Sequence, residues 1–188
     1  MTVDRLWFLA NRAAQRGEQA YHRLRERHEG FIELERTRHV SRQRFRTLAE
    51  RINRSGAPYG AHTVVYRPSG ELLLVRHEGV DKWVLPGGGV DDCDDDFRET
   101  AARELAEEAG IEATYEGLAM LTKLTIRSGG HQTTGVLPIF AARPCDVTLD
   151  VRDPDGEISA ARWFDDLPAD TRDRAQLKRW RQRSLGVA

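Results

Sequence analysis

Three glutamates near residue 105 have the type and spacing to hold a metal ion. Glu104, Glu107 and Glu108 occupy positions i, i+3 and i+4, which share one face of a helix. Their like charges repel one another unless a cation lies between them. Clusters of carboxylate oxygens suit Mg²⁺ or Mn²⁺. A solvated acidic helix face is the alternative interpretation of these three residues taken alone.

The surrounding residues favour the metal site. The stretch from Gly87 to Ile111 reads GGGVDDCDDDFRETAARELAEEAGI. This spacing resembles the signature of the Nudix hydrolase family (the MutT-like pyrophosphohydrolases), G-x5-E-x7-R-E-U-x-E-E-x-G-U, in which U is a bulky aliphatic residue. Eight of the nine fixed positions match. The exception is Asp95, which stands where the family has Glu and leaves the partner of this shorter side chain in doubt.

The resemblance implies roles for individual residues. The metal ligands are expected to be Glu104, Glu107, Glu108 and a backbone group of Gly89. Glu104 and Glu107 are also expected to be catalytic, together with Arg103, which we expect to brace a neighbouring carboxylate. The implied cofactor is Mg²⁺ or Mn²⁺. An ordinary surface arginine is the alternative interpretation of Arg103. Asp92, Asp94 and Asp95 are candidates for supporting the metal ligands from outside the coordination sphere, with solvated loop acids as an equal alternative.

A later loop is expected to add a catalytic base or a further metal ligand, as it often does in this family. Glu157 lies six residues before Trp163, a placement similar to that in MutT-like members. Asp153 and Asp155 in the same loop compete for this role. The chemistry implied is hydrolysis of a pyrophosphate bond, in which divalent ions neutralise phosphate charge and activate water.

The substrate implied by the resemblance is a nucleoside diphosphate linked to another moiety, a small molecule of the nucleotide or nucleotide-sugar type. Where members acting on ADP-ribose carry a proline, this chain has Ile126. Residues 127–129 lack the tyrosine associated with dinucleoside polyphosphates. His131 and Arg76 are candidates for contacting the substrate. A non-catalytic Nudix-fold binding or regulatory module is the alternative, which the presence of all three helix glutamates disfavours.

Local signals define the helix that carries the glutamates. Asp95 or Asp96 is expected to begin it, and Gly110 to end it. Its buried face is predicted to consist of Phe97, Ala101, Leu105 and Ala109. The glycines that precede it are not followed by Gly-Lys-Ser/Thr, which excludes a P-loop. They predict a tight turn that lets the backbone approach the helix and its metal.

The other elements predict an α/β fold. A hairpin is expected from the runs 62–67 and 71–76 around Pro68-Ser69-Gly70, followed by a short strand at 83–85. Further strands are predicted at 113–127, 132–142 and about 158–164, and a helix from Asp170 to Arg183. A mixed β-sheet between helices results, which agrees with the α/β/α sandwich that the Nudix resemblance implies.

Residues 1–55 predict a helical N-terminal extension before a Nudix domain at 60–188. Helical spacing ends near Gly30 and resumes at about 41–53, with Ser41 as N-cap. The extension holds 13 Arg, no Lys and seven acids, so its net charge is about +6 against −7 for the remainder. Its apolar stripe needs burial, on its own core or against a second subunit. We expect a homodimer, and we expect nucleic acid less because the acidic remainder repels phosphate.

Composition excludes several other classes. The 188 residues have a formal net charge of −1 and contain two cysteines that lie far apart in the sequence, so a disulfide framework is not expected. No apolar run approaches the 18 or so residues that a membrane helix needs. We therefore expect a cytoplasmic protein without a membrane segment.

Overall fold

The computed structural model describes residues 5–91 and 96–186 as a two-sheet α/β fold. Within these ranges no helix is long and apolar enough to cross a membrane. The elements are, in chain order, α1 (Arg5–Arg27), β1 (Ile32–His39), α2 (Arg42–Ser55), β2 (Ala61–Val65), β3 (Leu72–His77), the 3₁₀ turn η1 (Glu78–Val80), β4 (Lys82–Val84), β5 (Gly87–Gly88), α3 (Phe97–Ala109), β6 (Ala113–Ser128), β7 (His131–Pro144), β8 (Ile158–Phe164) and α4 (Arg174–Leu185).

The strands form a mixed five-stranded sheet in the order β1-β6-β7-β2-β5 and an antiparallel three-stranded sheet in the order β4-β3-β8. Helices α3 and α4 cover opposite faces of the three-stranded sheet. Leu73 and Val75 of β3 pack in the apolar cluster of α3, whereas Leu72 and Leu74 pack with Trp180 of α4. This alternation is the period of two of a strand buried on both faces. The predicted α/β/α arrangement with a mixed sheet is confirmed.

The expected limits of the glutamate helix are confirmed. The side chain of Asp96 caps α3 by accepting from the backbone N–H groups of Arg98 and Glu99 at 2.8 and 3.0 Å. Gly110 ends the helix in the left-handed conformation at φ 70°. Phe97 is half-buried rather than buried. The fully buried part of the predicted face consists of Ala101, Leu105 and Ala109.

The predicted hairpin is wrong, although both of its strands exist. β2 pairs with β7 and β5 in the larger sheet, while β3 pairs with β4 and β8 in the smaller one. A single bridge, Tyr66 with Leu72, joins the two runs. Leu72 to Val75 are completely buried and occupy the central strand of the smaller sheet. Pairing of β2 with β7 and of β3 with β8, which are distant in sequence, therefore replaces the β2–β3 pairing that the turn suggested.

The prediction that residues 1–55 are helical is corrected at one place, because residues 32–39 form β1. This strand pairs in parallel with β6, from Ile32 opposite Met120 to His39 opposite Arg127. Its burial alternates at first, with Ile32 buried and Glu33 exposed. Glutamates on the exposed face and the lack of turn residues concealed this period of two. The extension therefore supplies the edge strand of the main sheet.

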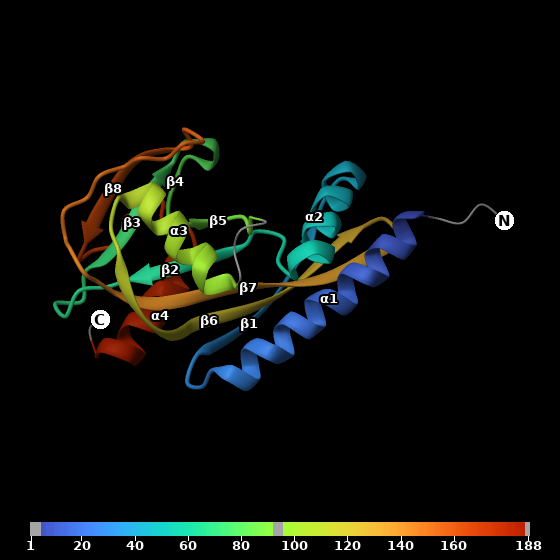
Figure 1. Ribbon diagram of the computed structural model, residues 1–188, viewed down its shortest axis with the longest axis horizontal. Helices are drawn as coiled ribbons and strands as arrows, with labels where there is room; N and C mark the ends of the chain where they lie inside the picture. The colour runs from blue at the N-terminus through green and yellow to red at the C-terminus, as the bar shows by residue number, and fades with distance from the viewer. Residues whose placement is uncertain (1–4, 92–95, 187–188) are drawn as a thin grey trace.

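Both helices of the extension dock on their own chain. α1 lies along β7 and against α2 (Figure 1), and Thr133 of β7 donates through Oγ1 to the carbonyl of Ala10 at 2.9 Å. Much of the apolar stripe is thereby buried, including Leu6, Leu24, Phe45, Leu48 and Ile52. Docking on the same core, one of the two expected solutions, is thus realised. The division of the chain into 1–55 and 60–188 stays a prediction.

Close packing of α1 on β7 makes Gly17 a test of this docking. A Cβ atom at this position would lie 2.0 Å from the carbonyl oxygen of Thr134. We expect Gly17→Ala to lower the free energy of unfolding by roughly 1–3 kcal/mol, because backbone must separate from backbone. Urea or thermal unfolding measures the change.

The matched control is Gly130→Ala, since a Cβ atom there has no neighbour within 4 Å. It should change stability by no more than about 0.5 kcal/mol. Equal effects of the two substitutions would contradict the docking of α1 on β7.

Candidate functional site

The three glutamates of α3 line a large cavity of about 1090 Å³. Glu108 is the most deeply placed, with 8 % of its surface exposed. The glycine turn at 87–89 and the loop that carries Glu157 line the same cavity. The fold therefore brings together the helix carboxylates, the glycine turn and the later loop, as the sequence predicted.

Arg103 holds part of this cluster in place. Its Nη1 atom donates to Glu104 Oε1 at 3.0 Å and to Glu107 Oε2 at 3.3 Å. Its Nη2 atom donates to the carbonyl oxygen of Gly89 at 2.9 Å. The guanidinium thus links the helix to the glycine turn and braces two carboxylates, the contact expected of it. The roles of Gly89 and the glutamates as metal ligands stay predictions.

The glycine turn is shaped by two close approaches. The N–H of Gly87 donates to Glu108 Oε2 at 2.8 Å, and a Cβ at this residue, whose φ is 148°, would lie 2.4 Å from the carbonyl oxygen of Ala61. A Cβ at Gly88 would lie 2.6 Å from Glu104 Oε2. Glycine is needed at both positions because β5 is held between β2 and the carboxylates of α3.

Burial in the cavity disfavours the ionised form of two of the glutamates, Glu104 and Glu108. Burial raises the pKa of Glu104 to about 7, although the charge of Arg103 opposes the shift. Burial raises the pKa of Glu108 to about 8, and the negative charges of Glu104, Asp153 and Glu157 add to this effect. The protein thus holds several acids where they repel one another and lack water.

Asp153 organises the loop opposite the helix. One carboxylate oxygen of Asp153 accepts from the backbone N–H of Glu157 at 2.5 Å and of Ile158 at 2.8 Å, and the other accepts from that of Asp155 at 3.1 Å. Glu157 contacts His77 Nε2 at 3.3 Å. Because Asp153 is engaged by backbone groups, this geometry favours Glu157 as the loop carboxylate that acts on a substrate.

These residues fit a hard divalent cation by their chemistry. In the described ranges, no three His, Cys, Asp or Glu side chains already form a metal cage. The available donors are nevertheless carboxylate oxygens, and the buried Glu108 is close enough to Glu104 for each charge to disfavour the other. A bound Mg²⁺ or Mn²⁺ would offset that repulsion. Asp92, Asp94 and Asp95, considered above, lie outside the described residues.

The opposite wall of the cavity comes largely from the extension, which the sequence analysis did not foresee. Arg36 and Arg38 of β1 and Arg51 of α2 line it. Arg36 pairs with Asp173 at 2.7 Å, and the guanidinium of Arg38 lies 5.2 Å from the ring centre of Tyr59. The sequence did contain a signal for this pair. Arg36 and Arg38 are two residues apart, and residues i and i+2 of a strand share a face.

His62 of β2 is a further residue that lines this cavity. Its Nδ1 atom is buried without a hydrogen-bond partner in the described part of the chain. Burial lowers its pKa to about 4, and the positive charge of Arg172 contributes. The imidazole is therefore neutral near pH 7, with an unused polar atom in the wall of the cavity.

Two predicted substrate contacts are not brought to this cavity. His131 lies at the turn between β6 and β7, where its ring centre is 6.0 Å from that of Phe45. Arg76 of β3 pairs with Asp170 at 2.5 Å and with Asp81. The turn that suggested His131 as a ligand is a distant part of the β6–β7 ribbon, and Arg76 is engaged by acids of two loops, one before β4 and one before α4.

Comparison of the sequence with known proteins identifies the family of this chain. The profile of the NUDIX domain matches residues 57–182. The chain belongs to the Nudix family. A putative 8-oxo-dGTP diphosphatase of Bacillus subtilis (strain 168) is 43% identical over 54 residues, which cover 29% of this chain and 36% of that protein. The chain thus spans about a third of the length of this curated relative.

Two solved structures have a similar fold. The NUDIX domain of Shewanella oneidensis NrtR, complexed with ADP ribose, is 18% identical with a TM-score of 0.51, covering 85% of this chain and 92% of that one. A UDP-X diphosphatase structure is 19% identical with a TM-score of 0.51, covering 90% of this chain and 71% of that one. At these identities the likeness concerns the fold alone.

The glycine turn of this Nudix chain offers a matched pair of substitutions. We expect Gly88→Ala to weaken Mn²⁺ binding by at least ~10-fold, because the new methyl group displaces the carboxylate of Glu104. Stability should change little, since the displaced atoms end a flexible side chain. Isothermal titration with MnCl₂ measures the affinity.

Gly89→Ala is the control, because a Cβ atom there has no neighbour within 4 Å and its carbonyl group is kept. Its Mn²⁺ affinity should stay within about threefold of the wild-type value, well below the ~10-fold effect of a lost ligand. Wild-type affinity in Gly88→Ala would show that Glu104 is not a ligand.

Proposed function

We propose that this protein is a Mg²⁺- or Mn²⁺-dependent pyrophosphohydrolase that cleaves a nucleoside diphosphate linked to another moiety. One observation carries the proposal. In a chain whose residues 57–182 match the NUDIX domain, one cavity is lined both by the carboxylates of Glu104, Glu107 and Glu108 and by arginines of the extension. Such a cavity has a place for a cation and a place for the phosphate oxygens that the cation must share.

Each group has a distinct task in this proposal. Glu104, Glu107, Glu108 and the backbone of Gly89 would hold the metal, which when bound supplies charge neutralisation at the pyrophosphate. Arg103 keeps Glu104 and Glu107 oriented. Glu157 takes the proton of the attacking water. The arginines of β1 and α2 bind and orient the phosphate oxygens, so that the reacting phosphorus faces the carboxylate wall.

The substrate class is a proposal supported by the relatives and by the cavity. The Bacillus subtilis relative is named as a putative 8-oxo-dGTP diphosphatase, and its similarity is confined to 54 residues. A cavity of about 1090 Å³ has room for a nucleotide, since sites for small ligands commonly span about 300–1,000 Å³. A non-catalytic Nudix module is the rival, which the braced carboxylates of α3 disfavour.

Charge removal at the carboxylates tests the activity. With a panel of nucleoside diphosphate derivatives and Mg²⁺ or Mn²⁺, Glu107→Gln and Glu157→Gln should each lower kcat by at least ~100-fold. Both variants should keep the wild-type fold, because these side chains line the cavity rather than the core. Phosphate release measured after a coupled phosphatase step gives the rates.

Asp155→Asn is the control for the loop, because it removes one charge from the same segment and its backbone N–H still bonds to Asp153. Its kcat should stay within about threefold of the wild-type value, far from the ~100-fold effect of losing the base. If Asp155→Asn is inactive and Glu157→Gln is not, Asp155 is the base. If Glu107→Gln turns over like the wild type, the assignment of the activity is wrong.

The arginine wall, which we define as Arg36, Arg38 and Arg51, should act on substrate binding rather than on the chemical step. We expect Arg38→Gln to raise KM by roughly 10-fold with little change in kcat, since a charged hydrogen bond to phosphate is lost in both ground and transition states. Arg46→Gln is the control, because Arg46 is exposed on α2 and does not line the cavity. Equal KM values in the two variants would remove β1 from the substrate site.

We also propose the homodimer expected from the sequence. Trp7 and Phe8 on the first turn of α1 are 54 and 51% exposed, with ring centres 5.1 Å apart, so an apolar patch persists after the extension has docked. Light scattering should show a dimer for the wild type and a monomer for Trp7→Ser/Phe8→Ser. Val147→Ser, which removes a 52% exposed side chain elsewhere, is the control. A monomeric wild type rejects the dimer.

The cytoplasmic location stays a prediction.

A further inference from the structure

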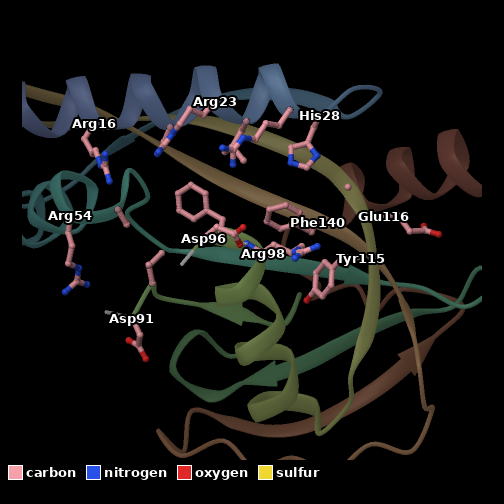
Figure 2. Close-up of a pocket in the computed structure, with 17 residues that line it drawn as sticks. Arg16, Arg23, His28, Arg54, Asp91, Asp96, Arg98, Tyr115, Glu116 and Phe140 are labelled. Atoms are coloured by element: carbon pink, nitrogen blue, oxygen red, sulfur yellow. Dashed lines mark hydrogen bonds between the residues drawn. The ribbon is translucent and has the colours of Figure 1, made fainter. Parts of the chain in front are cut away.

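A second cavity of about 730 Å³ lies between α1 and the beginning of α3 (Figure 2). Arginines from separate elements line it. They are Arg16, Arg23 and Arg27 of α1, Arg54 of α2 and Arg98 of α3. Figure 2 shows Arg16 and Arg23 pointing from α1 toward α3. We call this cavity the arginine pocket.

Among the residues that the structure describes, no ion pair neutralises the charge of the arginine pocket. In residues 5–91 and 96–186, none of its five arginines makes an ion pair. The acids of its walls are engaged elsewhere. Asp96 caps α3, Glu116 pairs with Arg143 at 2.5 Å, and Asp91 lies 3.7 Å from Arg103. The described part of the pocket therefore has more guanidinium groups than carboxylates paired with them.

Aromatic and apolar side chains form the inner part of the arginine pocket. Phe140 is buried, and its ring centre lies 6.1 Å from that of Tyr115 and 5.9 Å from that of His28. Phe97 and Leu24 also line it. Burial and the charge of Arg27 lower the pKa of His28, so the imidazole is neutral near pH 7. Guanidinium groups around an aromatic floor suit a ligand that combines phosphate with an aromatic ring.

Arginine abundance alone does not explain this arrangement. The extension holds 13 arginines, and a solvated helix would distribute them around its surface. Here four of them, three on α1 together with Arg54 of α2, meet Arg98 of α3 around a single hollow. The arginine pocket also shares Arg54, Val90 and Asp91 with the catalytic cavity, so the two sites adjoin at the loop that follows the glycine turn.

We propose that the arginine pocket is a second binding site, which takes the phosphate of a nucleotide between α1 and α3 and the nucleobase on its aromatic floor. This nucleotide has two possible sources: a free nucleotide, or the remote phosphate-bearing part of a substrate whose pyrophosphate occupies the adjoining cavity. Binding of the free nucleotide needs no hydrolysis, so it is testable whether or not the proposed activity is correct.

The test is AMP binding to the full-length protein in EDTA, measured by isothermal titration calorimetry. Arg16→Gln/Arg23→Gln should weaken binding by at least ~10-fold, because charged hydrogen bonds to phosphate are lost. The control is Arg5→Gln/Arg12→Gln, which removes the same charge from the exposed face of the same helix outside the pocket. It should bind within about twofold of the wild type, the scatter expected of screened distant charges.

Two results overturn the proposal. One is equal AMP affinity of Arg16→Gln/Arg23→Gln and the wild type, which would put the nucleotide in the catalytic cavity alone. The other is equal weakening in both double variants, which would show a general effect of positive charge on α1. If Arg16→Gln/Arg23→Gln does not fold by circular dichroism, the single variant Arg23→Gln, at an exposed position, decides the matter in the same assay.

Kinetics separates the two sources of the nucleotide. With any substrate that the wild type cleaves, a raised KM in Arg16→Gln/Arg23→Gln assigns the pocket to the remote part of that substrate. An unchanged KM together with lost AMP binding assigns it to a free nucleotide. An inactive wild type that still binds AMP through these arginines rejects the proposed function and leaves the second site supported.

Discussion

Repulsion among Glu104, Glu107 and Glu108 is the interaction on which the site depends. The fold forces these carboxylates together by anchoring α3 through its apolar face, which is buried against the strands. Arg103 and the N–H of Gly87 offset part of the repulsion. Burial, together with the repulsion that remains, raises the pKa of Glu104 to about 7 and that of Glu108 to about 8. The packing of the core thus holds the carboxylates together against their repulsion, at the site where we propose that a cation binds.

Local signals explain why this helix and its turn were predictable. Asp96 and Gly110 set its ends through contacts within one turn of the chain, and the spacing of Ala101, Leu105 and Ala109 set its buried face. β1 and the separation of β2 from β3 were not predictable in the same way. Their positions follow from pairing with β6, β7 and β8, whose residues are distant in sequence. The arginine wall was missed for the same reason, because it exists only once β1 lies beside β6.

The basic extension folds onto the acidic Nudix domain and brings arginines to two of its cavities. Pairing of β1 with β6 takes Arg36 and Arg38 to the cavity that the α3 glutamates line, and packing of α1 on β7 takes Arg16 and Arg23 to a neighbouring hollow. A basic segment folded onto an acidic one concentrates guanidinium groups around carboxylates without neutralising either completely. Such a surface suits phosphates that share a cation with the carboxylates.

The most direct measurement compares thermal unfolding of the wild type with that of Glu104→Gln/Glu107→Gln/Glu108→Gln, in EDTA and in Mg²⁺. Repulsion predicts that the triple variant is the more stable protein in EDTA, since amides of the same shape replace crowded charges. Mg²⁺ should raise the Tm of the wild type and leave that of the variant unchanged, because a ligand stabilises only the state that binds it. A wild type as stable as the variant in EDTA and unaffected by Mg²⁺ would contradict the account.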